Sequence, residues 1–93
     1  MNEPLPLTET KSLIRKILAE GTLSFTRHAE QEMAKDGLAK VDVENVLRGG
    51  AAAGGEWENG SWRYRVFTAR ITVVVAFRSW GSLVVITAWR QER

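Results

Sequence analysis

The chain has 93 residues, of which 44% are hydrophobic and 26% are charged, which is the composition of an ordinary globular protein and the length of one domain. It contains no cysteine and a single histidine, which excludes disulfides and thiolate metal sites and argues against a classical zinc site. No window holds the roughly 18 apolar residues that cross a bilayer, and the first residues lack the basic start and apolar run of an export signal. We therefore expect a cytoplasmic protein with no cofactor, no metal and no membrane partner.

The formal net charge of +2 conceals two halves of opposite sign. Residues 1–60 contain seven lysines and arginines against ten acidic residues, whereas residues 61–93 contain six arginines, no lysine and one acidic residue. The planar guanidinium group suits bidentate contacts to phosphate better than the lysine ammonium does. The second half therefore predicts an anionic ligand, with RNA or another phosphodiester as the first candidate.

The first half is predicted to be mainly helical. Residues 1–7 contain two prolines, which predicts a loose tail. Residues 8–20 carry an apolar stripe at helical spacing, and residues 23–26 form a short extended or loop piece. Thr26 then caps a second helix over residues 28–36, and a short third helix ends at Gly49 and Gly50.

The second half is predicted to be a sheet. Residues 49–55, with the sequence GGAAAGG, hold no side chain large enough to anchor them, which predicts a pliable connector between a helical half (8–48) and a sheet half (56–90). Asn59-Gly60 is a strong signal for a two-residue hairpin, whose register places Trp57 opposite Trp62 and Glu56 opposite Arg63. Further strands are expected at residues 61–68, 71–78 and 83–90, with a turn in residues 79–82. The expected fold is a single α+β domain with N-terminal helices packed on a twisted antiparallel sheet of about four strands.

Alternation along the strands divides their side chains between two faces. The strand at 61–68 places Trp62, Tyr64 and Val66 on one side and Arg63 and Arg65 on the other. In the last strand, the set that we expect in the core is Val84, Ile86 and Ala88. If the core sets share one face, the other face presents Arg63, Arg65, Thr87 and Trp89, which could grip phosphate and stack a base as single-stranded RNA binders do.

Two other interpretations of these strands stay open. Trp62 and Tyr64 could be the exposed set instead of the buried one. Arg63 could pair with Glu56 across the hairpin while the remaining arginines are merely solvated.

His28 is the side chain best suited to act as a general base, because imidazole changes its charge near neutral pH. Its place in the first turn of the expected second helix favours the neutral, proton-accepting ring. Glu32 follows one turn later on the same side and could orient that ring or share the proton transfer. The alternative is a histidine that only caps the helix or packs at its start.

The ordered set of short motifs resembles a family described as domain-of-unknown-function family 4258, and within it the small proteins encoded beside antitoxins of the MqsA type. The resemblance covers residues 25–90 and rests on Phe25-Thr26-Arg27-His28-Ala29, Glu32-Met33, Asp36-Gly37-Leu38, Asp42-Val43, Asn45-Val46-Leu47-Arg48-Gly49-Gly50, Trp62-Arg63-Tyr64-Arg65-Val66 and Val85-Ile86-Thr87-Ala88-Trp89-Arg90. It implies a RelE-like or barnase-like sheet toxin, an endoribonuclease held inactive by a cognate antitoxin. One departure is Glu32, because much of the family has arginine there.

We therefore expect the toxin of a type II toxin-antitoxin pair, which cleaves RNA without a metal ion and for which ribosome-bound messenger RNA is one candidate substrate. The catalytic residues would be His28, Glu32 and Arg65. The RNA-binding residues would be Arg63, Tyr64, Thr87, Trp89 and Arg90. The alternative function is a non-catalytic module that binds RNA or protein through the arginine-rich sheet.

Overall fold

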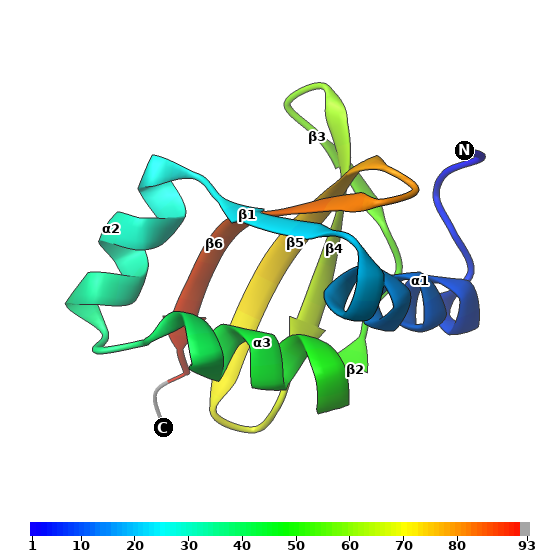
Figure 1. Cartoon of the computed structure of the whole chain (residues 1–93). Helices are drawn as coiled ribbons and strands as arrows, with labels where there is room; N and C mark the ends of the chain where they lie inside the picture. Colours follow the sequence, from blue (N-terminus) through cyan, green and yellow to red (C-terminus); the bar gives the residue numbers. More distant parts are fainter. Residues whose placement is uncertain (92–93) are drawn as a thin grey trace.

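In the computed structural model of this chain, the described residues form three helices that lie against one face of a mixed sheet (Figure 1). The structure describes residues 1–91, so Glu92 and Arg93, which enter the charge count above, lie outside the described residues. The elements in chain order are α1 (Leu7–Glu20), β1 (Thr22–Phe25), α2 (Arg27–Lys35), α3 (Lys40–Gly49), β2 (Ala51–Ala52), β3 (Glu56–Glu58), β4 (Ser61–Phe67), β5 (Ile71–Ser79) and β6 (Ser82–Arg90). Within residues 1–91, no helix has the length and apolar character needed to cross a membrane.

The α+β class and the order of helices before sheet are confirmed, but the predicted number of strands is too low. The described sheet has six strands in the order β1-β6-β5-β4-β2, with β3 paired to β4 beside that path. β1 pairs with β6 in parallel, and the other described pairs are antiparallel. The predicted helical half therefore contributes an edge strand to the sheet.

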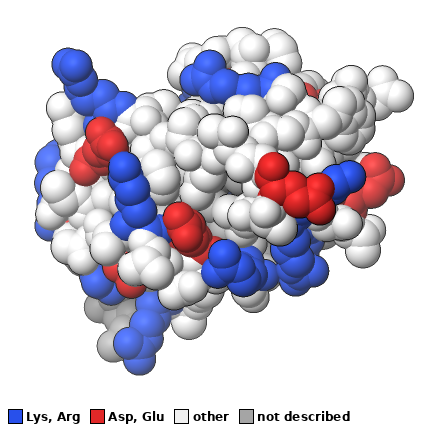
Figure 2. All heavy atoms as spheres, viewed as in Figure 1, with Lys and Arg blue, Asp and Glu red and all other residues white. Residues whose placement is uncertain are grey.

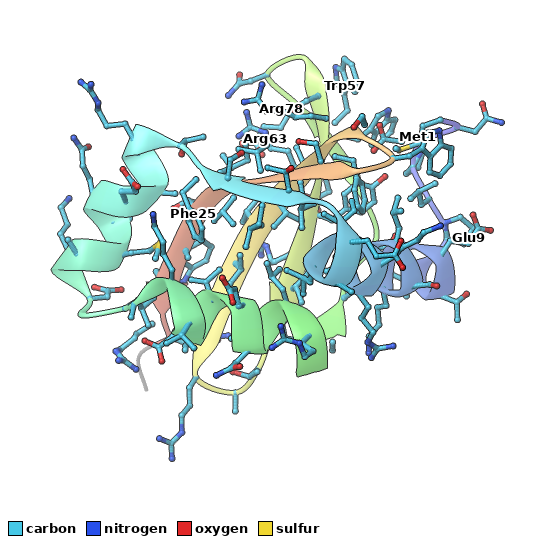
Figure 3. All side chains as sticks on the ribbon, viewed as in Figure 1. Met1, Glu9, Phe25, Trp57, Arg63 and Arg78 are labelled. Atoms are coloured by element: carbon cyan, nitrogen blue, oxygen red, sulfur yellow. The ribbon has the colours of Figure 1, made fainter. Side chains whose placement is uncertain are left out.

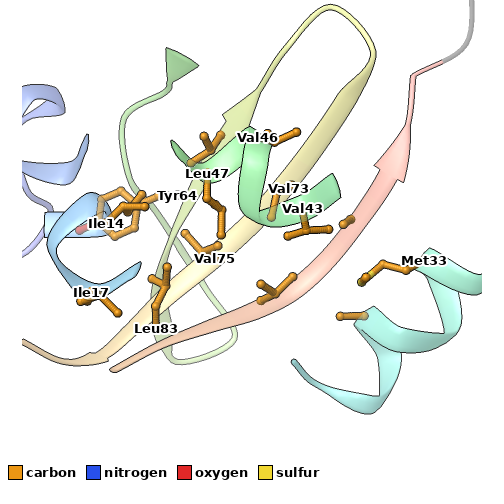
Figure 4. Packing of buried hydrophobic residues seen from close by; sticks show 14 of the residues in the cluster. Ile14, Ile17, Met33, Val43, Val46, Leu47, Tyr64, Val73, Val75 and Leu83 are labelled. Atoms are coloured by element: carbon orange, nitrogen blue, oxygen red, sulfur yellow. The ribbon is translucent and has the colours of Figure 1, made fainter. Parts of the chain in front are cut away.

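The core lies between the helices and the face of the sheet that they cover (Figure 4). Ile14 and Ile17 from α1, and Val43 and Leu47 from α3, are buried against strand residues that include Tyr64. Figure 4 shows these side chains converging from both layers. This burial of apolar surface is the main force that holds the helices on the sheet.

The hairpin register is confirmed. Asn59 and Gly60 have φ values of 52° and 84°, the positive values that a two-residue hairpin turn needs. Trp57 pairs with Trp62, and Glu56 pairs with Arg63.

The predicted core set of the last strand is wrong in part. Leu83, Val85 and Ala88 belong to the cluster under the helices, Val84 is buried outside that cluster, and Ile86 is only half-buried. The reason is an irregularity in β6: Val75 pairs with Val85 and Val74 with Thr87, so Ile86 is an extra residue that reverses the alternation.

The first residues are not the loose tail that the sequence predicts. Leu5 is only 6% exposed, and its backbone N–H donates to the hydroxyl of Tyr64 at 3.0 Å. The same hydroxyl donates to a carboxylate oxygen of Glu3 at 2.8 Å. A buried phenol requires hydrogen-bond partners, and this segment supplies them.

The connector at residues 49–55 is also not pliable. It contains β2, in which Ala51 pairs with Phe67 and Ala52 with Val66. A Cβ atom on Gly55 would lie 2.8 Å from Cε2 of Tyr64, and one on Gly50 would lie 2.7 Å from the carbonyl oxygen of Val46. These glycines therefore allow the backbone to pack closely, which is a structural role and not flexibility.

This packing predicts the effect of adding one methyl group. Gly55→Ala should lower the free energy of unfolding by about 1–3 kcal/mol, because the methyl group meets a ring that is fully buried. Gly54→Ala is the matched control, since a methyl group there would have no atom within 4 Å beyond its own chain neighbours. Urea denaturation of both variants measures the difference, and equal effects would contradict the close approach at Gly55.

Candidate functional site

The face of the sheet opposite the helices presents the residues that the sequence predicts for it. Arg65 pairs with Val74, which in turn pairs with Thr87, and these three form one row across β4, β5 and β6. Trp89 belongs to the next row, with Thr72 and Phe67. Arg63 lies two residues from Arg65 on the same strand and so points to the same side. We call this surface, defined by Arg63, Arg65, Val74, Thr87 and Trp89, the open face.

Arg78 is a further cation on the open face that the sequence reasoning missed. It stands at an irregularity of β5 between Phe77, which pairs with Leu83, and Ser79, which pairs with Ser82. Ala76 and Arg78 alternate with the core residues Val75 and Phe77, and this alternation is the signal that could have found it. Figure 3 shows Arg78 near Arg63, whereas Figure 2 shows acidic and basic side chains interspersed over the helical side.

A hollow at the β4 end of the open face contains the two predicted arginines. It is lined by Arg63 and Arg65, by Glu56 and Glu58 of β3, and by Val74. The ion pairs of the described residues are Lys35–Glu32 and Lys40–Glu30, so the alternative pairing of Arg63 with Glu56 is not among them. Arg63 Nε donates to Ser61 Oγ instead, at 3.4 Å. We call this site the arginine hollow.

His28 is exposed in the first turn of α2, and Thr26 is the residue that caps the helix. Thr26 Oγ1 accepts from the backbone N–H of Ala29 at 2.9 Å and donates to the carbonyl of Ile86 at 3.0 Å. The buried side of α2 is filled by Ala29 and Met33. The structure therefore does not show the alternative in which His28 caps the helix or packs in the core.

The flank of α2 that carries His28 is turned away from α3. Glu30 contacts Lys40 at the start of α3, at 3.5 Å, on one side of the buried stripe. At 100° per residue, His28 and Glu32 lie on the other side of that stripe. α2 packs on β6, so this flank belongs to a helix that lies beside β6 and is not covered by α3.

His28 does not lie in the arginine hollow, because neither His28 nor Glu32 is among its lining residues. α2 packs on β6, whereas the hollow is at β4, and β5 lies between these strands. Two strand spacings correspond to about 10 Å. An extended ligand that crosses the sheet could contact both places, whereas a single phosphate group held in the hollow would lie away from the imidazole.

Besides Arg63, three more of the predicted site residues have structural partners. Glu32 accepts from Lys35 Nζ at 3.0 Å, so the predicted pairing of its carboxylate with His28 is not formed. Arg90 donates from Nε to the carbonyl of Asp36 at 2.8 Å, and its backbone N–H donates to the Asp36 carboxylate at 2.8 Å. Arg90 thus connects the end of α2 to β6 through these hydrogen bonds. The predicted contact of Arg90 with RNA would compete with them.

Tyr64 is the third, and its side chain has no exposed surface for the contact with RNA that the sequence predicts. Its side chain is 0% exposed, on the helical side of the sheet. Burial raises the pKa of the phenol to about 12; the hydrogen bond from Leu5 lowers it, and donation to Glu3 raises it. Tyr64 therefore belongs to the core, which also decides the open question of which aromatic set is buried.

The fold and the open face define a small α+β protein with an uncovered, arginine-bearing sheet, and among the described residues no three His, Asp or Glu side chains gather as a metal-binding group. The family described as Domain of unknown function (DUF4258) matches residues 25–90, so the chain belongs to this family. The match begins at the last residue of β1 and ends at the last residue of β6, so it includes the open face and His28. Comparison with curated proteins and with solved structures gave no match.

Proposed function

We propose that this protein is the toxin of a type II toxin-antitoxin pair, RelE-like in fold, and that it cleaves single-stranded RNA in the cytoplasm. The observation that supports the proposal is an exposed His28 on α2, which packs on β6, the strand that presents Thr87 and Trp89 on the same sheet face as Arg65. The partner would be a cognate antitoxin of the MqsA type. Its acidic segments would complement the arginines of the open face.

In this proposal the RNA strand crosses the sheet from β6 to β4. Trp89 offers a stacking surface for a base, and the guanidinium groups of Arg63 and Arg65 hold phosphates. Because about two strand spacings separate β6 from β4, the strand must be extended for both ends of the face to be occupied.

His28 would act as the general base without a metal ion. It takes the proton from a ribose 2′-hydroxyl, and the 2′-oxygen attacks the adjacent phosphorus in line with the 5′-oxygen that leaves. The products are a 2′,3′-cyclic phosphate and a 5′-hydroxyl, whose proton comes from an acid. Tyr64 cannot be that acid because it is buried, so Glu32, released from its ion pair with Lys35, or a water polarised by an arginine would supply the proton.

A second candidate function is a non-catalytic module that binds RNA through the open face. This function is favoured because Glu32 is paired with Lys35 and Arg90 is bonded to Asp36. Neither of these predicted site residues is in contact with His28 within residues 1–91. The two candidates predict the same binding surface and differ only in cleavage.

The shared binding surface is tested by the salt dependence of RNA affinity. Arg65→Gln should weaken binding of a single-stranded oligonucleotide and reduce the slope of log affinity against log salt by about 0.7, the value for one phosphate contact on a single strand. Arg70→Gln, an exposed arginine in the β4–β5 turn, is the matched control. Identical slopes for the two variants would contradict the assignment of Arg65.

Toxin activity is tested by induced expression. The wild-type chain should arrest growth and produce RNA fragments that end in cyclic phosphate, and co-expression of the product of the adjacent gene should relieve both effects. Normal growth together with intact RNA, at verified levels of folded protein, would overturn the proposal.

A further inference from the structure

The arginine hollow contains two carboxylates that the proposed binding of phosphate does not explain. Glu56 and Glu58 line it together with Arg63 and Arg65. In the hairpin register Glu56 faces Arg63 and Glu58 faces Ser61, so both carboxylates lie on the same side of the ribbon as the arginines. The hollow has a volume of about 90 Å³.

These opposite charges share the hollow without forming an ion pair among the described residues. The ion pairs of residues 1–91 lie within α2 and between α2 and α3, and the Nε of Arg63 is directed to Ser61. A guanidinium group only donates hydrogen bonds, whereas a carboxylate accepts at two oxygens. The complementary ligand therefore carries an anionic group next to a pair of N–H donors.

We propose, on the basis of the RNA-binding function proposed above, that the arginine hollow is a base-reading subsite for guanine. Among the four RNA bases, guanine presents two adjacent donors, N1–H and the N2 amino group, which match the two oxygens of one carboxylate. Adenine and cytosine place a ring acceptor beside their amino group, and that acceptor repels a carboxylate. Arg63 and Arg65 hold the phosphate that adjoins the guanosine.

A purely electrostatic role for the carboxylates predicts the opposite change in RNA affinity when they are neutralised. If Glu56 and Glu58 only offset the charge of the arginines, their neutralisation strengthens the binding of every RNA. If they accept hydrogen bonds from guanine, their neutralisation weakens the binding of guanine-containing RNA selectively. The difference between two RNAs therefore separates the two roles.

The experiment measures fluorescence anisotropy with labelled uridine heptamers whose central base is guanine, hypoxanthine or adenine. The wild type should bind the guanine heptamer about tenfold more tightly than the adenine heptamer, with an intermediate value for hypoxanthine, which lacks the amino group. The double variant Glu56→Gln, Glu58→Gln should bring the guanine-to-adenine ratio close to one. Glu9→Gln, an exposed carboxylate on α1, should leave it unchanged.

Two results would overturn the guanine subsite: equal affinity of the wild type for the guanine and adenine heptamers, or a double variant that binds both more tightly by the same factor. In either case the proposed RNA-binding function stands. Failure of the wild type to bind any of the three heptamers would overturn both the function and the subsite. Circular dichroism of the double variant establishes that the hairpin change leaves the fold intact.

Discussion

His28→Ala is expected to lower the rate of RNA cleavage by about a hundredfold or more while the affinity for RNA changes little. The loss follows from the removal of the base that accepts the 2′-hydroxyl proton, a contribution of about 10²–10⁴ in typical enzymes. Affinity is retained because the phosphate-binding arginines stand on β4 and not on α2. Single-turnover cleavage and anisotropy binding, measured on the same oligonucleotide, separate the two quantities.

The control for this prediction is Gln31→Ala, an exposed residue of the same helix. Both substitutions are on the surface of α2, so each should change the free energy of unfolding by no more than about 0.5 kcal/mol. If His28→Ala cleaves RNA at the wild-type rate, the ribonuclease mechanism fails, and the non-catalytic RNA-binding module becomes the function of the open face.

Local signals in the sequence predicted the local parts of the fold. The hairpin register follows from two residues, Asn59 and Gly60, because only a turn with positive φ values closes so short a connection. The cap at Thr26 is likewise a local interaction. By contrast, the extended piece expected at residues 23–26 becomes β1 by pairing with β6, which lies about 60 positions further along the chain, and no local pattern predicts that pairing.

The run Val84-Val85-Ile86-Thr87 explains why the alternation failed in β6. All four residues are β-branched and fit either face of a strand, so nothing in their chemistry marks Ile86 as the extra residue. Thr87 and Trp89 follow the irregularity, and their assignment to the face of Arg65 is correct.

The open face could therefore be predicted from the sequence, but the partners of its candidate residues could not. Arg90 meets Asp36 and Tyr64 meets Leu5 across 54 and 59 positions of the chain. Such contacts depend on how α2 and the first residues pack on the sheet. A tyrosine between two arginines has the same sequence pattern whether its ring binds a ligand or fills the core.

Tyr64→Ala is expected to lower the free energy of unfolding by about 3–5 kcal/mol, the cost of removing a large aromatic side chain from a core. Tyr64 is the largest fully buried side chain within residues 1–91, and it packs edge to face on Phe77 with ring centroids 5.2 Å apart. A domain of this size has a total stability of roughly 5–10 kcal/mol, so the variant should be close to unfolding. Trp80→Ala, at a position that is 61% exposed, should change stability by no more than about 0.5 kcal/mol.

Tyr64→Phe removes only the hydroxyl group and keeps the ring in the core. It should therefore stay folded even if Tyr64→Ala unfolds. It leaves the backbone N–H of Leu5 without its partner, which should cost about 1–3 kcal/mol. Because burial raises the pKa of Tyr64 from its usual value of about 10 to about 12, the folded state keeps the phenolic proton where the unfolded chain has lost it. The stability of the wild type should therefore fall as pH rises from about 10 to 12, relative to its value below pH 10.

Tyr64→Phe lacks this titration, whereas the other titrating groups are common to both proteins. The stability difference between wild type and Tyr64→Phe should consequently be constant below pH 10 and shrink above it. Urea denaturation of the pair at several pH values measures that difference. A stability difference that stays constant up to pH 12 would show that the Tyr64 hydroxyl is not held in the buried hydrogen bonds with Leu5 and Glu3. That result would also contradict the packing of the first residues against Tyr64.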